Sequence, residues 1–436
     1  MARKIRPKEQ AAILQALQAG VVPKNGLQHI QVGRKPELNA LIKDIERIAD
    51  GGSAFRLIVG EYGAGKTFFM HVVKHIALKQ KLVTVNADLS PERRLVASGG
   101  QSRMLYSELI SNLSTMSSPE GNALGNILDV FTHSIVKESK DTDTPAAELI
   151  EQKLLCLNSY VGGYDMSKVM IAYCKGYQEG DDHLRNSALR WLRGEYTTKT
   201  EARQDLGVRT FIDDNMVYDA LKLIARFVEI AGFKGMLVIL DEGVNLFKIH
   251  NTASRKSNYE MVLRILNDTL QGDAEHFGIL MGVTQETVFD AKRGFCSYAA
   301  LSSRLTQNQF AAQSGLVDYN QPTISLVNLT PEELYVLLGN VRNVFAGGGD
   351  EDTWLIDNAG IQAFMKHCHE KMGAAYFQTP RESVRSFVNL LSMLDQYPDK
   401  RWSDFIESLE LRNDIDPNVE KELAKTGAQE LQEFSL

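Results

Sequence analysis

Apolar positions at helical and strand spacing alternate along the first part of the chain. The spacing predicts helices over residues 8–19, 36–50, 67–80 and 102–113, and short apolar runs predict strands over 54–59 and 82–87. Gly51-Gly52-Ser53 ends the second of these helices before the first strand begins. Because strands alternate with helices, the pattern favours a parallel sheet flanked by helices.

Two unbroken apolar runs follow later, over residues 235–240 and 277–283, and are of the kind buried on both faces of a sheet. An amphipathic helix over 215–230 leads into the first run. Residues 115–210 carry Ser, Pro, Gly, Asp and Thr between helical patches and predict a mostly helical insertion. Its length leaves open how many core strands lie between the second strand and the run at 235–240, and so leaves the strand order open.

Composition restricts the class of protein. The chain has 436 residues, 44% apolar and 24% charged, which is ordinary for a soluble protein of several domains. No apolar stretch is long enough to cross a membrane. The basic N-terminus is not followed by an apolar segment, so we do not expect secretion. The four scattered cysteines favour reduced thiols in the cytoplasm. The net charge of −7 means that DNA contact would need a local basic patch or an oligomer.

Residues 60–67 read Gly-Glu-Tyr-Gly-Ala-Gly-Lys-Thr, which matches the phosphate-binding loop G-x-x-x-x-G-K-[ST]. Glycines let successive backbone N–H groups point at phosphate oxygens, and the helix that follows adds its positive end. We expect Lys66 to reach the β- and γ-phosphates of a nucleotide and the Thr67 hydroxyl to bind Mg²⁺. The loop lies between a predicted strand and a predicted helix, as this chemistry requires.

Asp241 and Glu242 end the apolar run at 235–240 and so lie at the carboxyl end of a central strand. Asp241 is expected to hold Mg²⁺ and Glu242 to polarise the attacking water. The alternative, taken for the pair alone, is an acidic strand end that caps the next helix. An Asp-Glu pair favours hydrolysis over transfer of the phosphoryl group to another substrate.

Further polar residues follow the next strand. Thr284 or Gln285 could hold the water or sense the γ-phosphate, and a threonine that satisfies a turn is the other interpretation. Arg304 is a candidate arginine finger or a solvated surface arginine. Arg381 begins a helix in the C-terminal region and could report the nucleotide state, with Arg385 as the second choice.

The order of these motifs resembles that of the AAA+ ATPases. Val32-Gly33-Arg34 with Glu37-Leu38 looks like the box that these proteins place near the adenine. Residues 60–67 correspond to Walker A and Asp241-Glu242 to Walker B. Thr284 or Gln285 corresponds to sensor 1, Arg304 to the arginine finger and Arg381 to sensor 2. Residues 12–23, 60–68, 88–95, 232–242 and 329–334 are similar to the ATP-binding proteins of the BREX phage-exclusion systems, in particular the shorter BrxD type.

This resemblance implies an α/β fold of the P-loop NTPase, AAA+ type, with a parallel central sheet, a helical insertion and a C-terminal helical lid domain. It implies the cofactors ATP and Mg²⁺, hydrolysis of ATP, a homo-oligomer in which Arg304 acts in trans, and a role in defence against phage. DNA and a helicase, nuclease or methyltransferase are the implied partners. Its nucleotide-binding residues would be Val32, Gly33, Gly60, Tyr62, Gly63, Ala64, Gly65, Lys66, Thr67, Phe68 and Arg381.

On this basis the chain divides into six segments: an N-terminal helical segment (1–30), the two parts of the AAA+ core (31–114 and 211–328), the helical insertion between them (115–210), the lid domain (329–398) and a charged tail (399–436).

Three other features were weighed as sites. His367-Cys368-His369 lacks a further ligand pair nearby, so it does not favour a metal site. Residues 185–209 mix arginines and lysines with Trp191 and Tyr196, which could contact DNA, but interspersed acidic residues favour a solvated helical face. The basic N-terminus has the same two interpretations.

Two further functions remain besides the ATPase. One is a nucleotide-dependent switch or scaffold with little hydrolysis, which phosphate release would distinguish from an ATPase. The other is a P-loop kinase, which the Asp-Glu pair and Arg381 disfavour because they suit hydrolysis and sensing of the nucleotide.

Overall fold

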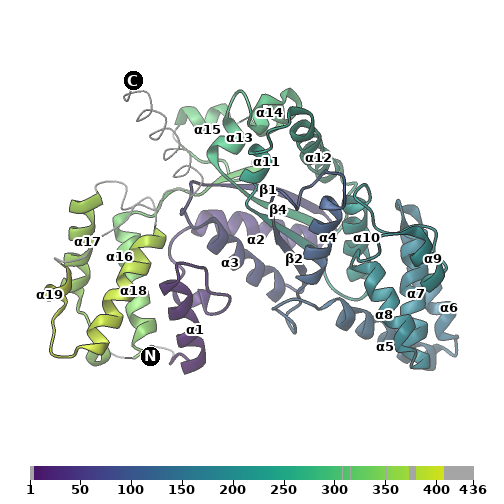
Figure 1. Ribbon diagram of the computed structural model, residues 1–436, viewed down its shortest axis with the longest axis horizontal. Coiled ribbons are helices and arrows are strands. Elements are labelled where there is room, and N and C mark those ends of the chain that lie inside the picture. Colours follow the sequence, from purple (N-terminus) through teal and green to yellow (C-terminus); the bar gives the residue numbers. More distant parts are fainter. Residues whose placement is uncertain (1–3, 307, 315, 350, 373–379, 407–436) are drawn as a thin grey trace, which may run out of the picture. The chain divides into compact units, whose positions relative to one another are not determined.

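The computed structural model describes residues 4–406 except 307, 315, 350 and 373–379 (Figure 1). The chain divides into two compact units. We call residues 36–59 and 73–324 the sheet unit, and residues 1–35, 60–72 and 325–436 the helical unit. Each is described by itself.

The sheet has five strands in the order β2-β3-β4-β1-β5 (Figure 1). They are β1 (Ser53–Val59), β2 (Val83–Asp88), β3 (Met236–Asp241), β4 (Phe277–Val283) and β5 (Thr323–Ser325). The pairs β1–β4, β3–β4 and β2–β3 are parallel, which confirms the mixed α/β fold with a parallel sheet that the sequence predicts.

The register aligns the carboxyl ends of these strands. Val59 of β1 lies opposite Val283 of β4, and Asp88 of β2 lies opposite Asp241 of β3. Parallel strands that stay in step in this way bring the residues after each strand to one edge of the sheet.

The strand order left open by the sequence follows from one pairing. β2 pairs directly with β3, and none of the five strands comes from residues 89–235, of which Ser114 forms a single antiparallel bridge with Thr84 of β2. These residues form helices, which Figure 1 shows grouped around α10. These are α4 (Gln101–Ser111), α5 (Leu124–Thr142), α6 (Ala146–Leu154), α7 (Gly163–Glu179), α8 (Asp182–Leu192), α9 (Lys199–Leu206) and α10 (Val217–Ile230).

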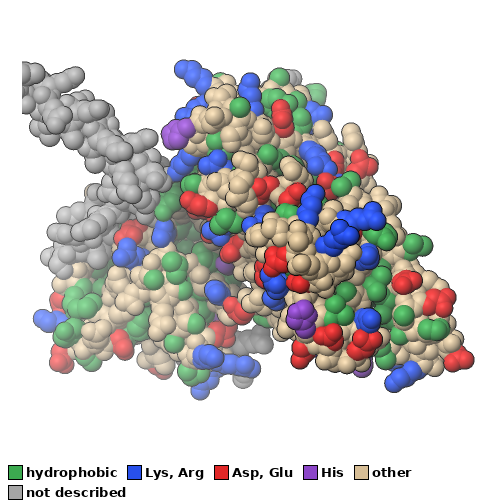
Figure 2. Space-filling view, turned by 45° about the vertical axis from the view of Figure 1, so that its right-hand side comes forward, with side chains coloured by type: hydrophobic (Ala, Val, Ile, Leu, Met, Phe, Trp, Pro, Cys, Tyr) green, Lys and Arg blue, Asp and Glu red, His purple; other side chains and the backbone are tan. Residues whose placement is uncertain are grey.

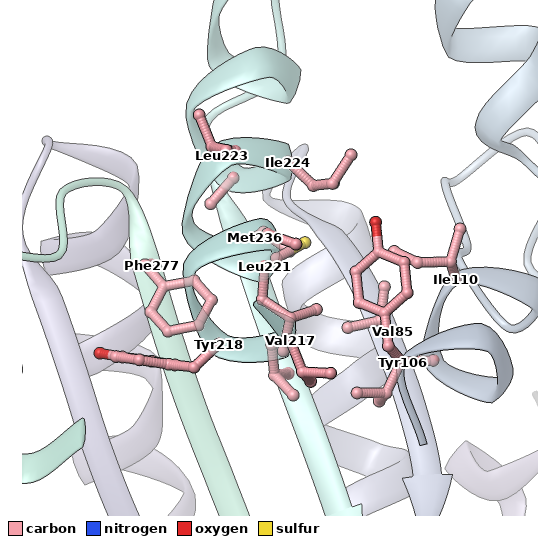
Figure 3. Close-up of a cluster of buried hydrophobic side chains, with 14 of the residues drawn as sticks. Val85, Tyr106, Ile110, Val217, Tyr218, Leu221, Leu223, Ile224, Met236 and Phe277 are labelled. Atoms are coloured by element: carbon pink, nitrogen blue, oxygen red, sulfur yellow. The ribbon is translucent and has the colours of Figure 1, made fainter. Parts of the chain in front are cut away.

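Helix α10 packs its apolar side on the sheet (Figure 3). Tyr218 meets Phe277 of β4 with ring centroids 6.2 Å apart, and Leu221 lies beside Met236 of β3. The same hydrophobic cluster continues through Val85 and into the buried side chains of α5 and α7. Insertion and sheet therefore share one core.

A buried ion pair joins helix α2 (Lys35–Ala49) to β1. Arg56 lies on β1 and donates from Nε to Asp44 Oδ2 at 2.6 Å and from Nη2 to Asp44 Oδ1 at 3.1 Å. Its Nη1 donates to the carbonyl of Gln321 in the segment before β5. Both charged side chains are at least nine-tenths buried. The pair thereby ties a helix, a central strand and the approach to the edge strand together.

The sequence missed several elements of the sheet unit. Helix α12 (Thr252–Gln271) is the longest of them, and it buries Arg255 and Asn258 on the face where apolar residues would be expected. Arg255 donates a hydrogen bond to the carbonyl of Ile249. The Asn258 amide accepts from the backbone N–H of Val96 and donates to its carbonyl. The others are α11 (Val244–Phe247), α13 (Gln285–Phe289), α14 (Ala299–Leu305), α15 (Gln309–Ser314) and β5.

The helical unit combines an N-terminal helix with helices from the last quarter of the chain. Helix α1 (Pro7–Gln18) shares a hydrophobic cluster with α16 (Pro331–Phe345), α17 (Asn358–Met372), α18 (Pro380–Gln396) and α19 (Trp402–Ile406). Gln10 donates to the carbonyl of Phe345 at 2.7 Å. Thr330 and Glu333 form a capping box at the start of α16, as the Thr-Pro-Glu-Glu sequence predicts. Helix α3 (Lys66–Lys79) begins in this unit and continues into the sheet unit.

Breaking the buried ion pair should destabilise the fold. Asp44→Ala leaves the Arg56 guanidinium buried without its carboxylate, so we expect the free energy of unfolding to fall by about 3–5 kcal/mol in urea denaturation. The control is Asp50→Ala, an exposed residue just after the same helix, which should change it by less than about 0.5 kcal/mol. Equal losses in the two variants would contradict the role given to Asp44.

Candidate nucleotide-binding site

The phosphate loop begins directly after Val59, the last residue of β1, and ends in the first turn of α3. Gly63 and Gly65 have φ of 76° and 83°, in the left-handed region that side chains disfavour. The loop therefore needs glycine at these two positions to curl its backbone. The Lys66 ammonium donates to the carbonyls of Gly60 and Glu61, each at 2.8 Å, and so lies against the loop's own backbone.

The segment that resembles the adenine box contacts the loop. Arg34 Nη2 donates to the carbonyl of Ala64 at 2.7 Å. Gly33, next to it, has φ of 67°, in the left-handed region, and lies so close to the carboxylate of Glu333 that a Cβ there would displace it. Since Glu333 belongs to the capping box of α16, this segment joins the loop to the start of that helix. Val32, expected at the nucleotide, is partly buried beside them.

Two side chains of the loop reach the rest of the helical unit. The phenolic oxygen of Tyr62 accepts a hydrogen bond from Arg381 Nη1 at 3.2 Å, and Phe68 packs against the hydrophobic cluster of that unit. The structure therefore brings the sequence-predicted Arg381 to the loop. Arg385, the second choice, forms an ion pair with Glu382 at 3.6 Å on its own helix.

Asp241 and Glu242 lie at the carboxyl end of β3, in the sheet unit. Asp241 is 8% exposed, and its Oδ1 accepts from the backbone N–H of Glu242 at 2.8 Å. Glu242 has φ of 55°, rare for a residue with a side chain, and its side chain is exposed. The next backbone N–H, of Gly243, donates to the carbonyl of Gly282 on β4 at 2.8 Å. This tight turn exposes the Glu242 side chain at the strand end, while the Asp241 side chain stays buried.

Asp88 is a carboxylate that the sequence reasoning did not select. It ends β2 opposite Asp241, and burial and the charge of Asp241 raise its pKa, against a lowering influence of Arg93. Two carboxylates in this relation favour a nearby cation, since a divalent ion relieves their repulsion. The available signal was its place at a strand end, the same that identified Asp241.

Thr284 follows β4 and begins α13. Its Oγ1 accepts from the backbone N–H of Thr287 at 3.3 Å and lies 2.8 Å from the Thr287 hydroxyl. The geometry matches the interpretation of a threonine that satisfies a turn, and it leaves the residue one position past the strand end, beside the end of β3. Gln285 is the first residue of the short helix.

Arg304 lies exposed on α14. Its Nε donates to Asn267 Oδ1 and its Nη1 to the carbonyl of Ala300, both at 2.8 Å. Within the sheet unit the guanidinium is thus held on the surface between α12 and its own helix, where solvent or another molecule can reach it.

The aromatic residues among the basic residues at 185–209 do not form a base-stacking surface. Trp191 and Tyr196 are fully buried, and Arg190 pairs with Glu201 at 2.9 Å while Arg185 pairs with Asp129 at 3.4 Å. On the face shown in Figure 2, acidic and basic side chains lie among one another. These findings support the interpretation as a solvated helical face.

Two further findings concern the part of the chain that the structure describes. There, no three His, Cys, Asp or Glu side chains gather as a metal site would require, and Cys368 of the His-Cys-His sequence is buried inside α17. In the same residues, no helix is both long and apolar enough to span a bilayer.

Comparison with known proteins bears on the whole chain. Residues 5–410 match the family model described as BREX system ATP-binding protein BrxC/D. Comparison with curated proteins gives no match.

The structural role of Thr284 can be tested directly. Thr284→Ala removes the acceptor for the Thr287 N–H, so the free energy of unfolding should fall by about 1 kcal/mol in urea denaturation. Thr284→Ser keeps the hydroxyl and should retain most of the stability. If the serine variant were as unstable as the alanine variant, the cap would not be the reason.

Proposed function

The chain belongs to the BREX system ATP-binding protein BrxC/D family, and from this premise we propose that it is an ATPase of the AAA+ type acting in defence against phage. It converts ATP and water to ADP and phosphate, works as an oligomer, and acts with DNA or with DNA-processing partners such as a helicase, nuclease or methyltransferase.

One observation carries the proposal. Strand β1 leads directly into the phosphate loop, and β3, separated from β1 only by β4, ends in Asp241-Glu242. A phosphate-binding loop and a carboxylate pair on strands so arranged are the two parts that hydrolysis of a nucleoside triphosphate needs. We assign both parts to the same reaction.

The loop backbone and Lys66 would hold the phosphates, and Thr67 and Asp241 would hold Mg²⁺. The donor set suits this ion, since a hydroxyl and a carboxylate are the oxygen ligands that Mg²⁺ prefers. The bound ion would neutralise charge on the β- and γ-phosphates. Asp88, opposite Asp241 on the neighbouring strand, would add negative charge beside it.

Glu242 acts as the base that orients and polarises the attacking water. Its exposure and left-handed backbone at the strand end support this role, because a sparsely populated conformation is retained where the surrounding structure enforces it and recurs at functional sites. Thr284, on the neighbouring strand end, would touch the same water or the γ-phosphate.

Two arginines complete the proposed machinery. Arg381 senses the γ-phosphate from the lid side, and its bond to Tyr62 supports that placement. Arg304 stabilises the transferring phosphoryl group of a neighbouring copy, which its exposure permits.

Glu242→Gln should keep nucleotide binding and lose turnover. The amide has the shape of the carboxylate but accepts no proton, so phosphate release should fall by about 10²- to 10⁴-fold while ATP affinity, measured by calorimetry, stays near that of the wild type.

The matched control is Glu46→Gln, an exposed glutamate on α2, which should leave both quantities unchanged. Wild-type protein that binds ATP but releases no phosphate, with or without DNA and partner proteins, would support a nucleotide-dependent switch in place of an ATPase.

Arg304→Ala should lose at least about tenfold in phosphate release and keep ATP affinity. The sharper test mixes this variant with Glu242→Gln. If Arg304 acts in trans, mixed oligomers pair an intact Glu242 site with an intact neighbouring Arg304, and activity returns.

Arg203→Ala, an exposed arginine on α9, is the control for the loss of one surface charge. Mixtures that stay as inactive as their components would contradict action in trans, and normal turnover by Arg304→Ala alone would remove the residue from the site.

A further inference from the structure

We propose that the hydroxyl of Tyr62 positions Arg381 at the phosphate loop and so sets how strongly the protein prefers a nucleoside triphosphate over a diphosphate. This inference rests on the proposed function, since it takes the loop as the nucleotide site. Tyr62 is thereby a positioning residue, acting through the arginine rather than on the nucleotide.

The contact is specific. Arg381 Nη1 donates to the Tyr62 phenolic oxygen at 3.2 Å, between residues 319 positions apart in the chain. Both residues belong to the helical unit, as does the whole loop. The bond therefore links the start of α18 with the third residue of the loop inside one compact unit.

The chemistry of the pair suits a positioning role. A guanidinium has five N–H donors in a planar fork, and the phenol uses one of them. The phenol is neutral, so it orients the fork without cancelling its charge. A donor of this fork that turns to the nucleotide would meet the γ-phosphate, which a diphosphate lacks.

The N-terminal segment confines the same side chain from another direction. Gly20 has φ of 69°, and a Cβ built on it would lie 3.2 Å from Arg381 Nε. Glycine thus lets the backbone after α1 approach the guanidinium closely. The neighbouring Arg385 is directed to Glu382 instead, so of these two arginines the structure brings Arg381 to the loop.

The test is a double-mutant cycle on the full-length protein, with calorimetric affinities for MgADP and for the magnesium complex of the non-hydrolysable triphosphate AMP-PNP. Tyr62→Phe should weaken AMP-PNP binding by about fivefold, as expected for the loss of one solvent-exposed hydrogen bond, and leave MgADP affinity unchanged. Arg381→Ala should weaken AMP-PNP binding more, by about tenfold or greater.

The decisive variant is Tyr62→Phe/Arg381→Ala. If Tyr62 acts only through Arg381, the double variant binds both nucleotides as Arg381→Ala does. Tyr397→Phe, which removes a phenolic hydroxyl just past the far end of α18, is the matched control and should retain the wild-type ratio of affinities.

Three results would overturn the inference: independent, multiplicative losses in the double variant, an equal loss for both nucleotides in Tyr62→Phe, or no loss for AMP-PNP. MgADP affinity also reports whether the loop of each variant is intact. Failure of the nucleotide site itself looks different, because the wild-type protein would then bind neither nucleotide. Failure of hydrolysis alone would appear as wild-type protein that binds both nucleotides and releases no phosphate from ATP.

Discussion

The parallel register of the central strands is the constraint on which the candidate chemistry depends. β1, β4 and β3 run side by side in step, so the residues that follow Val59, Val283 and Asp241 leave the sheet at one edge. Every strand position is buried in these three elements, so β3 and β4 are continuous apolar runs up to the strand end. β1 departs from this pattern at Ser53 and at Arg56, whose charge is paired with Asp44. A slip of one residue in this pairing would turn Asp241 to the other face of the sheet.

Local sequence signals predicted much of this arrangement. The glycines of residues 60–67 predict a loop with left-handed backbone conformations, and Gly63 and Gly65 have such conformations. The apolar runs at 235–240 and 277–283 gave the strands to within a residue, because a strand buried on both faces leaves an unbroken pattern. The family resemblance read from the motifs is confirmed by the match over residues 5–410.

Other features had no local signal. Helix α12 buries Arg255 and Asn258, whose hydrogen bonds to the carbonyls of Ile249 and Val96 replace the apolar contacts that periodicity detects. β5 has three residues, too few for a pattern. The importance of Asp88 depends on its pairing with β3, about 150 residues later in the sequence, and the contact of Arg381 with Tyr62 depends on the fold of the whole helical unit. The roles given to Thr284, Arg304 and Arg381 stay predictions.

The insertion between β2 and β3 has a consequence for how this protein folds and evolves. It adds no strand, so by topology alone it resembles an accessory that could be exchanged between relatives. Its buried side chains, however, belong to the same hydrophobic cluster as those of the sheet. Deleting the insertion would expose that apolar surface to water. A destabilising change in α5 or α7 would also loosen the packing of the strands and so shift the strand ends. Insertion and sheet should therefore melt in a single cooperative transition and drift together in sequence, as parts of one domain.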